Sequence, residues 1–243
     1  VWLLVCIMIA YTGTSVFTYQ LQTGMSAVET KRLLNTNVDD VKQDIKDASD
    51  KNLLAITKSI QKECAALPSL DTDTLQKLCE EYEVTEINIV DWNGIITSST
   101  VPEFIGYDMV SGGQSVEFLV LLGSVDEVVQ RYQPLSIDET IMRKYAGVKM
   151  PGGGFVQVGY DAEKFQKDIR MQVAGIAKNR HIGSNGFVII CDQEQNVLIE
   201  KNGYSGETLE RLGIDLDTEN ISEGTIFEAT VYGEPVYCVY TLV

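Results

Sequence analysis

Ile87–Ser98 reads INIVDWNGIITS, and Val188–Ile199 reads VIICDQEQNVLI. Each segment consists of a short apolar run that ends in Asp, a polar turn and a second apolar run, which is typical of a β-hairpin. A glycine-bearing loop and further β-rich segments follow each copy. An internal repeat of this kind indicates two similar domains in series. We therefore predict an α+β fold in which a long N-terminal helix precedes two tandem domains with antiparallel sheets.

Length and charge limit the classes of function. A chain of 243 residues is long enough for two domains that each bury a core of their own. The formal net charge of −16 argues against nucleic acid as a partner, because an acidic protein repels phosphate groups. The same charge disfavours a protein that lies flat on an anionic lipid surface.

The N-terminal stretch is strongly apolar over residues 1–11, and no charged residue occurs before Glu29. Alone this run is too short for a membrane span, which needs about 20 apolar residues. We predict that residues 1–19 are part of a transmembrane helix whose cytoplasmic end lies outside this sequence. A cleaved signal peptide is the alternative, but the run lacks an Ala-x-Ala-like cleavage site.

A long stalk helix is predicted over residues 20–67, where no proline occurs before Pro68. Its apolar residues Leu34, Val38, Val41 and Ile45 recur at spacings of three and four, as in an amphipathic or coiled-coil helix. Such a helix must pack on a domain, on a partner helix or on both, since propensity alone does not stabilise it. We expect a homodimer through this seam.

The remaining pattern divides the chain into a first domain over residues 68–161, a connecting helix over 162–184 and a second domain over 185–243. In the first domain we expect a short helix over 74–82, the first hairpin and strands over 125–135, 140–150 and 155–160. The second domain has its hairpin and two strands over 225–232 and 235–242, one strand fewer than the first. A sheet that lacks a strand exposes unpaired backbone, so we expect the last strand and a second transmembrane helix after Val243.

Four cysteines lie outside the apolar N-terminal run. Cys64 and Cys79 are near the ends of two successive predicted helices, where either a disulfide or two buried free thiols fit the pattern. Cys191 and Cys238 lie within apolar β-runs and are expected in the core. His181 is the one histidine and no C-x-x-C occurs, so the sequence gives no basis for a metal site.

The order of these elements resembles the double Cache (tandem PAS-like) sensor domains of bacterial transmembrane receptors. The resemblance covers residue 16 to the end of the chain and includes the paired Asp-turn hairpins. It also includes the run RKYAGV at 143–148 and the run FVQVGYD at 155–161. It implies that the first domain, 68–161, is membrane-distal and holds a small ligand, and that the second, 185–243, is membrane-proximal; the strand count predicts that this second domain is truncated.

Amino-acid-binding members of that family place an Arg with aromatic neighbours on the third strand, a Tyr on the fourth and an Asp after the fifth. The positions that match in kind are Arg131 with Tyr132, Tyr145, and Asp161. An amino acid or small carboxylate also needs a guanidinium for its carboxylate, for which Arg131 and Arg143 are the candidates. Asp161 could instead cap the helix that begins at 162. The tyrosines could be core residues, and a solvated strand face is the alternative for the arginines.

The function that follows is an extracytoplasmic ligand sensor anchored in the cell membrane, with a cytoplasmic output domain outside this sequence. No catalytic motif is present, so we expect no enzyme, no catalytic residue and no cofactor in this region. The alternative is a structural or protein-interaction module that binds no small molecule. A membrane-anchored enzyme would need a cluster of titratable groups in one cleft.

Overall fold

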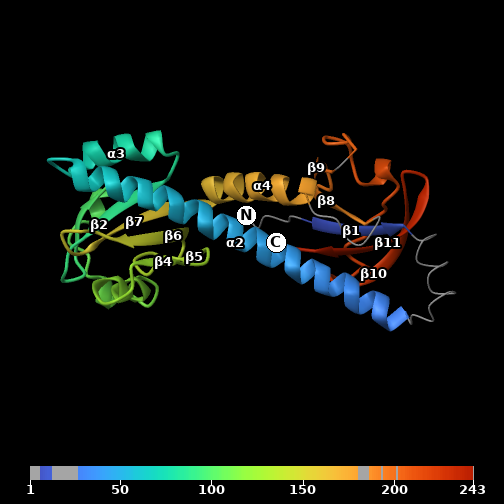
Figure 1. The fold of residues 1–243 in the computed structure, drawn as a ribbon, viewed down its shortest axis with the longest axis horizontal. Helices are drawn as coiled ribbons and strands as arrows, with labels where there is room; N and C mark the ends of the chain where they lie inside the picture. Colours follow the sequence, from blue (N-terminus) through green and yellow to red (C-terminus); the bar gives the residue numbers. More distant parts are fainter. Residues whose placement is uncertain (1–5, 13–26, 180–185, 193, 201, 243) are drawn as a thin grey trace. The chain divides into compact units, whose positions relative to one another are not determined.

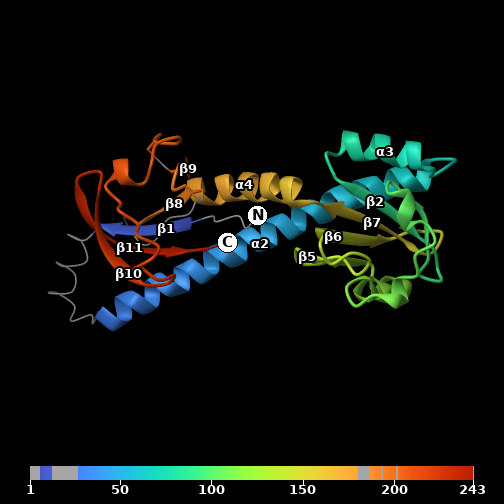
Figure 2. The same ribbon diagram turned by 180° about the vertical axis from the view of Figure 1, so that it is seen from behind.

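A computed structural model describes residues 6–12, 27–179, 186–192, 194–200 and 202–242. The chain forms two compact units. One, here called the inserted unit, consists of Asp47–Ile169; the other, the terminal unit, consists of the residues up to Lys46 and those from Arg170 onward. Each unit has its own antiparallel sheet (Figures 1 and 2). The mixed α+β class predicted from the sequence is therefore confirmed.

The inserted unit contains a six-stranded sheet in the order β3-β2-β7-β6-β4, with β5 paired to β6. Its elements are the second part of α2 (Ala27–Ala66), α3 (Thr72–Glu81), β2 (Glu86–Val90), β3 (Ile96–Ser99), the 3-10 helices η1 (Pro102–Phe104), η2 (Met109–Ser111) and η3 (Ser115–Leu122), β4 (Glu127–Val129), β5 (Gln133–Pro134), β6 (Met142–Lys149), β7 (Phe155–Tyr160) and the start of α4 (Ala162–Asn179). The one strand expected over 125–135 is thus two short strands.

Both faces of this sheet are covered, as Figure 1 shows. Helices α2 and α3 pack on one face, where Leu53, Ile60 and Leu75 are fully buried. The 3-10 helices pack on the other face, where Phe118 and Phe155 are fully buried. Because side chains alternate between the faces of a strand, β2, β4, β6 and β7 each contribute to both cores.

Helix α2 confirms the long helix where the structure describes it, from Ala27 to Ala66. The residues predicted as its dimer seam are, however, covered within one chain: Val38, Val41 and Ile45 are exposed by only 5%, 0% and 1%. The three-four spacing predicts an apolar stripe but not its partner, because such a stripe packs equally well on a domain of its own chain or on a partner helix.

The terminal unit contains a five-stranded sheet in the order β10-β11-β1-β8-β9. Its strands are β1 (Cys6–Thr12), β8 (Phe187–Cys191), β9 (Val197–Ile199), β10 (Ile226–Val231) and β11 (Glu234–Thr241), with the 3-10 helix η4 (Glu210–Leu212) after the hairpin. Read from the hairpin, the two sheets have the orders β9-β8-β1-β11-β10 and β3-β2-β7-β6-β4. β1 is therefore the centre strand of its sheet, as β7 is in the inserted unit. The missing centre strand is therefore supplied by the N-terminal segment.

The helix predicted over residues 1–19 differs from the structure wherever that stretch is described. Residues 6–12 form β1, which pairs antiparallel with both β11 and β8; residues 1–5 and 13–19 lie outside the described residues. A short apolar run fits a buried centre strand as well as a helix, so periodicity alone does not separate the two. Among the helices that the structure describes, none is long and apolar enough to cross a membrane.

The two hairpins match in detail. Asp91 Oδ1 accepts hydrogen bonds from the backbone N–H groups of Asn93 (2.8 Å) and Ile95 (3.0 Å), and Asp192 Oδ1 accepts one from Asn196 N–H (2.8 Å). Both first strands also carry a register irregularity near their ends. The repeated Asp thus closes each turn through backbone contacts.

Cys64 and Cys79 are buried free thiols in the helix-side core of the inserted unit. Burial raises the pKa of Cys64 to about 11 and that of Cys79 to about 12. Of the two alternatives left by the sequence, the structure therefore has free thiols. Cys191 and Cys238 are buried in the sheet of the terminal unit, as expected.

The acid stability of the terminal unit is expected to depend on Glu223. Its carboxylate accepts hydrogen bonds from Lys42 Nζ (2.7 Å), Thr241 Oγ1 and the N–H of Leu242 (3.1 Å), which together lower its pKa to about 2. This contribution is complete above the ordinary pKa near 4.5 and is lost as the pH falls toward 2.

We expect Glu223→Gln to lower the free energy of unfolding at pH 7 by no more than about 1 kcal/mol, because the side chain is 41% exposed and solvent screens the pair. The difference from the native chain should vanish near pH 2 in urea unfolding. Glu219→Gln is the control, since its exposed carboxylate accepts no hydrogen bond from the described residues. A difference of the same size at both pH values would contradict this assignment.

Candidate functional site

Polar residues interrupt the apolar strands on the 3-10-helix face of the inserted unit. Asn88 lies between Ile87 and Ile89 on β2, and Gln157 lies between Val156 and Val158 on β7. The two polar residues are cross-strand partners in the register of β2 and β7. Both are almost fully buried, at 1% and 3% exposure. Because buried amides need partners, this position is either a structural network or a binding site.

A chain of hydrogen bonds joins these amides to Glu86, which is 1% exposed at the start of β2. Asn88 Nδ2 donates to Glu86 Oε1 (2.6 Å) and to Gln157 Oε1 (3.0 Å). Ser99 Oγ on β3 donates to Asn88 Oδ1 (2.6 Å). The Asn88 amide is therefore fully engaged and its orientation is fixed.

Tyr145 on β6 reaches across the sheet into this network, and its hydroxyl donates to Glu86 Oε1 (2.8 Å). The ring has room because residue 159 is glycine: a Cβ there would lie 2.5 Å from Tyr145 Cε1. Burial raises the pKa of Glu86 above its ordinary value, against the hydrogen bonds from Tyr145 and Asn88 and the charge of Arg143. Burial and the adjacent Glu86 likewise raise the pKa of Tyr145.

Arg143 also lies on this face of β6, two residues before Tyr145. Its Nε is 3.7 Å from Glu86 Oε2, and its guanidinium donates to the backbone carbonyl of Met142 (3.1 Å). A distance of 3.7 Å is too long for a direct hydrogen bond, and both facing atoms are buried without a hydrogen-bond partner. The charge of Arg143 is thus directed toward Glu86.

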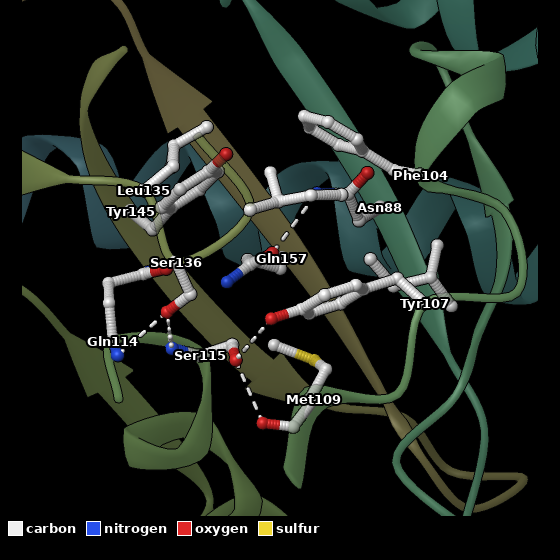
Figure 3. Close-up of a pocket in the computed structure, with 12 residues that line it drawn as sticks. Asn88, Phe104, Tyr107, Met109, Gln114, Ser115, Leu135, Ser136, Tyr145 and Gln157 are labelled. Atoms are coloured by element: carbon white, nitrogen blue, oxygen red, sulfur yellow. Dashed lines mark hydrogen bonds between the residues drawn. The ribbon is translucent and has the colours of Figure 1, made fainter. Parts of the chain in front are cut away.

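A pocket opens in front of the amide network, between the sheet and the segments that contain η1, η2 and η3 (Figure 3). The space between these walls measures about 330 Å³, a volume that includes open solvent at the mouth of the pocket. The lining is a mixture of apolar or aromatic and uncharged polar side chains: Asn88, Ile96, Phe104, Tyr107, Met109, Gln114, Ser115, Leu135, Ser136, Ile137, Tyr145 and Gln157.

The candidate residues from the sequence have different positions. Tyr145 lines the pocket, whereas Arg131, Tyr132, Arg143 and Asp161 are not among its lining residues. Arg131 is exposed after β4, and Tyr132 stacks on the ring of Phe165 at 4.9 Å between ring centroids.

Asp161 is at the start of α4. Its Oδ1 accepts a hydrogen bond from Lys164 N–H (2.9 Å), and its carbonyl accepts one from Phe165 N–H (2.9 Å). This is the helix-capping arrangement that the sequence left open as an alternative to ligand binding.

Sequence reasoning missed most of the pocket. The available signal was the single polar residue inside each apolar strand, Asn88 on β2 and Gln157 on β7. The residues from the connecting segments, such as Tyr107 and Ser136, had no comparable signal, because their convergence depends on the path of a long irregular stretch. Within the described residues, no group of three His, Cys, Asp or Glu side chains is placed to hold a metal ion.

No protein-family model matches the sequence, and no curated protein matches it. Solved structures that the chain partly resembles include an extracellular ligand binding receptor from Desulfohalobium retbaense DSM5692, at 14% identity and a TM-score of 0.36, over 90% of this chain and 41% of that one. Another is the sensor domain of the V. cholerae histidine kinase DctB, at 12% identity and a TM-score of 0.34, over 93% of this chain and 99% of that one. At these values neither similarity identifies the function of the chain.

Proposed function

We propose that this chain is the extracytoplasmic ligand-sensing region of a bacterial transmembrane receptor, and that its ligand is a small molecule bound in the pocket of the inserted unit. The observation that supports this most directly is the pocket itself. It combines aromatic and apolar walls with a buried, oriented amide network, which is the composition of small-molecule sites. The repeated strand order supports a tandem PAS-like arrangement, with the inserted unit as the membrane-distal domain.

Strand β6 is suited to pass on the occupancy of this pocket. Tyr145 lines the pocket, and the preceding residue, Lys144, points to the opposite face of the sheet. There Lys144 Nζ binds Asp50 Oδ1 (2.7 Å) and Ser49 Oγ (2.8 Å) of α2. A displacement of Tyr145 on binding would therefore shift the contacts of Lys144 with α2, and the first part of α2 belongs to the terminal unit.

The test is a screen of small polar molecules against the full chain by thermal shift, followed by calorimetry of the hits. Ile137 lines the pocket and is 43% exposed, so Ile137→Trp should narrow the pocket without a large packing cost. We expect this variant to weaken binding at least about tenfold, or about 1.4 kcal/mol. Bound ligand should also change hydrogen exchange along α2, as a sensor requires.

Ile105→Trp is the matched control, because Ile105 is 47% exposed in the same unit but does not line the pocket. Its affinity for the same ligand should stay within about twofold of the native value. If no compound binds, or if both variants bind equally well, the chain is not a sensor that uses this pocket. A structural or protein-interaction module would then be the better interpretation.

A further inference from the structure

In the side-chain amide of Gln157, the oxygen is hydrogen-bonded and the nitrogen is not. Its Oε1 accepts the hydrogen bond from Asn88 Nδ2. Its Nε2 takes part in no hydrogen bond with the described residues, although the residue is only 3% exposed. Figure 3 shows this nitrogen pointing into the space between Ser136 and Tyr107. This nitrogen is not among the fully buried polar atoms that lack a partner, so it is open to the pocket and can donate to an acceptor on a ligand.

The orientation of this amide follows from Glu86. Glu86 Oε1 already accepts from Tyr145, so the Asn88 atom that faces it must be the donor Nδ2 and not Oδ1. The same Nδ2 faces Gln157, which must then present its oxygen to Asn88 and its nitrogen to the pocket. Glu86 thus fixes the orientation of the Asn88 amide, which in turn directs the nitrogen of Gln157 to the pocket.

A second donor lies nearby. Ser136 Oγ accepts from the backbone N–H groups of Gln114 (2.8 Å) and Ser115 (3.2 Å), so its own hydroxyl hydrogen is left for the pocket. The hydroxyl of Ser115 behaves differently, since it donates to the carbonyl of Met109 (2.8 Å) and accepts from Tyr107 at 3.4 Å. Gln157 Nε2 and Ser136 Oγ are therefore two neighbouring donors that face the pocket.

No lining residue carries a formal charge at neutral pH. The basic side chain closest to the network, that of Arg143, is directed to Glu86 instead. A carboxylate ligand would lose its hydration without gaining a cation, which is unfavourable in a buried site. A neutral carbonyl oxygen would satisfy the two donors at a much lower desolvation cost, and Phe104, Tyr107 and Met109 would cover an apolar or aromatic body.

We infer that the pocket selects an uncharged carbonyl compound, such as a carboxamide on a flat ring, whose oxygen accepts hydrogen bonds from Gln157 Nε2 and Ser136 Oγ. This inference rests on the proposed function and narrows its ligand class. It replaces the amino acid or small carboxylate expected from the sequence.

The test uses two matched pairs of probes, benzamide with benzoate and nicotinamide with nicotinate, measured by calorimetry on the full chain. The amides should bind at least about tenfold more tightly than the carboxylates. Gln157→Glu replaces the free N–H donor by a carboxylate oxygen and should weaken amide binding by about tenfold or more. Gln157→Met removes the donor without adding charge and should have an effect in the same direction.

Gln76→Glu, the same substitution on the exposed face of α3, is the control and should leave amide binding unchanged. Preferential binding of the carboxylates, with loss in Ile137→Trp, would overturn the ligand class and leave the sensor proposal in place. Equal amide binding by Gln157→Glu, Gln157→Met and the native chain would overturn the role of Gln157. Binding of neither probe class at about 10 mM would overturn the inference, since a specific site binds more tightly.

Discussion

Lys144→Met is expected to lower the free energy of unfolding of the inserted unit by about 3–5 kcal/mol, the range for removal of one partner from a buried ion pair. Lys144 is 3% exposed, and its Nζ is 2.7 Å from Asp50 Oδ1 and 5.2 Å from the ring centroid of Phe165. Methionine would keep much of the packing of the Lys stem, so the loss should come from the charge. Native-state hydrogen exchange of the β6 and β7 amides gives the measurement.

The loss should be large because Lys144 is the cation of a connected network. Its Nζ donates to Ser49 Oγ, and Ser49 in turn donates to Asp168 Oδ2 (2.5 Å). Asp168 is 1% exposed and also accepts from Asn52 Nδ2 (2.7 Å). Without Lys144, Asp50 loses this ion pair, and Ser49, which donates to Asp168, loses its own donor.

Lys77→Met is the matched control, since Lys77 is exposed on α3 and should contribute less than about 0.5 kcal/mol. The double variant Lys144→Met with Asp168→Asn should lose less unfolding free energy than the two single variants lose together. The difference should be about 0.5–3 kcal/mol, the range for residues in one network. A loss of under 1 kcal/mol for Lys144→Met, together with additive effects, would show that the network does not stabilise the unit.

The sequence predicted the parts of this fold that depend on local pattern. The two hairpins were found because Asp91 and Asp192 each accept backbone hydrogen bonds within their own turns, and such contacts depend on a few adjacent residues. The long helix was found for the same reason, since a three-four apolar spacing is a local signal. What the helix packs against is not local, and the structure covers Val38 and Val41 within the chain.

The N-terminal segment shows the limit of such reasoning. The count of strands correctly indicated that the second sheet lacked one, but not which segment would supply it. β1 pairs with β11 through register partners more than 220 residues away, such as Ile9 with Val239. A short apolar run fits a centre strand as well as part of a membrane-spanning helix, so its composition does not separate the two.

The candidate site was predicted only in part for a related reason. The residue types named from the sequence were charged or aromatic, and of these only Tyr145 lines the pocket. The oriented donor, Gln157, is neutral and sits in an apolar strand, where a single polar residue indicates burial with partners but not which partners. Its partner, Asn88, comes from a strand about seventy residues earlier in the chain and is itself bonded to Glu86 of that strand.

Phe118→Ala should be as destabilising as the loss of Lys144, at about 3–5 kcal/mol, the usual cost of truncating a buried phenylalanine. Phe118 on η3 is fully buried, is stacked on Phe155 with ring centroids 6.2 Å apart, and meets Tyr145 edge-on at 6.3 Å. It also packs against Gly147, where a Cβ would come within 2.7 Å of the ring. The cavity would therefore open behind the residue that lines the pocket.

Two results should follow from this position of Phe118. Stability should fall as measured by urea unfolding, and ligand affinity should fall with it, because Tyr145 would lose the ring that supports it against the pocket. Val120→Ala is the control on the same 3-10 helix: Val120 is 48% exposed and should cost less than about 0.5 kcal/mol. If Phe118→Ala lowered stability but left affinity intact, the pocket wall would not depend on this core, and β6 alone would have to hold Tyr145 in place.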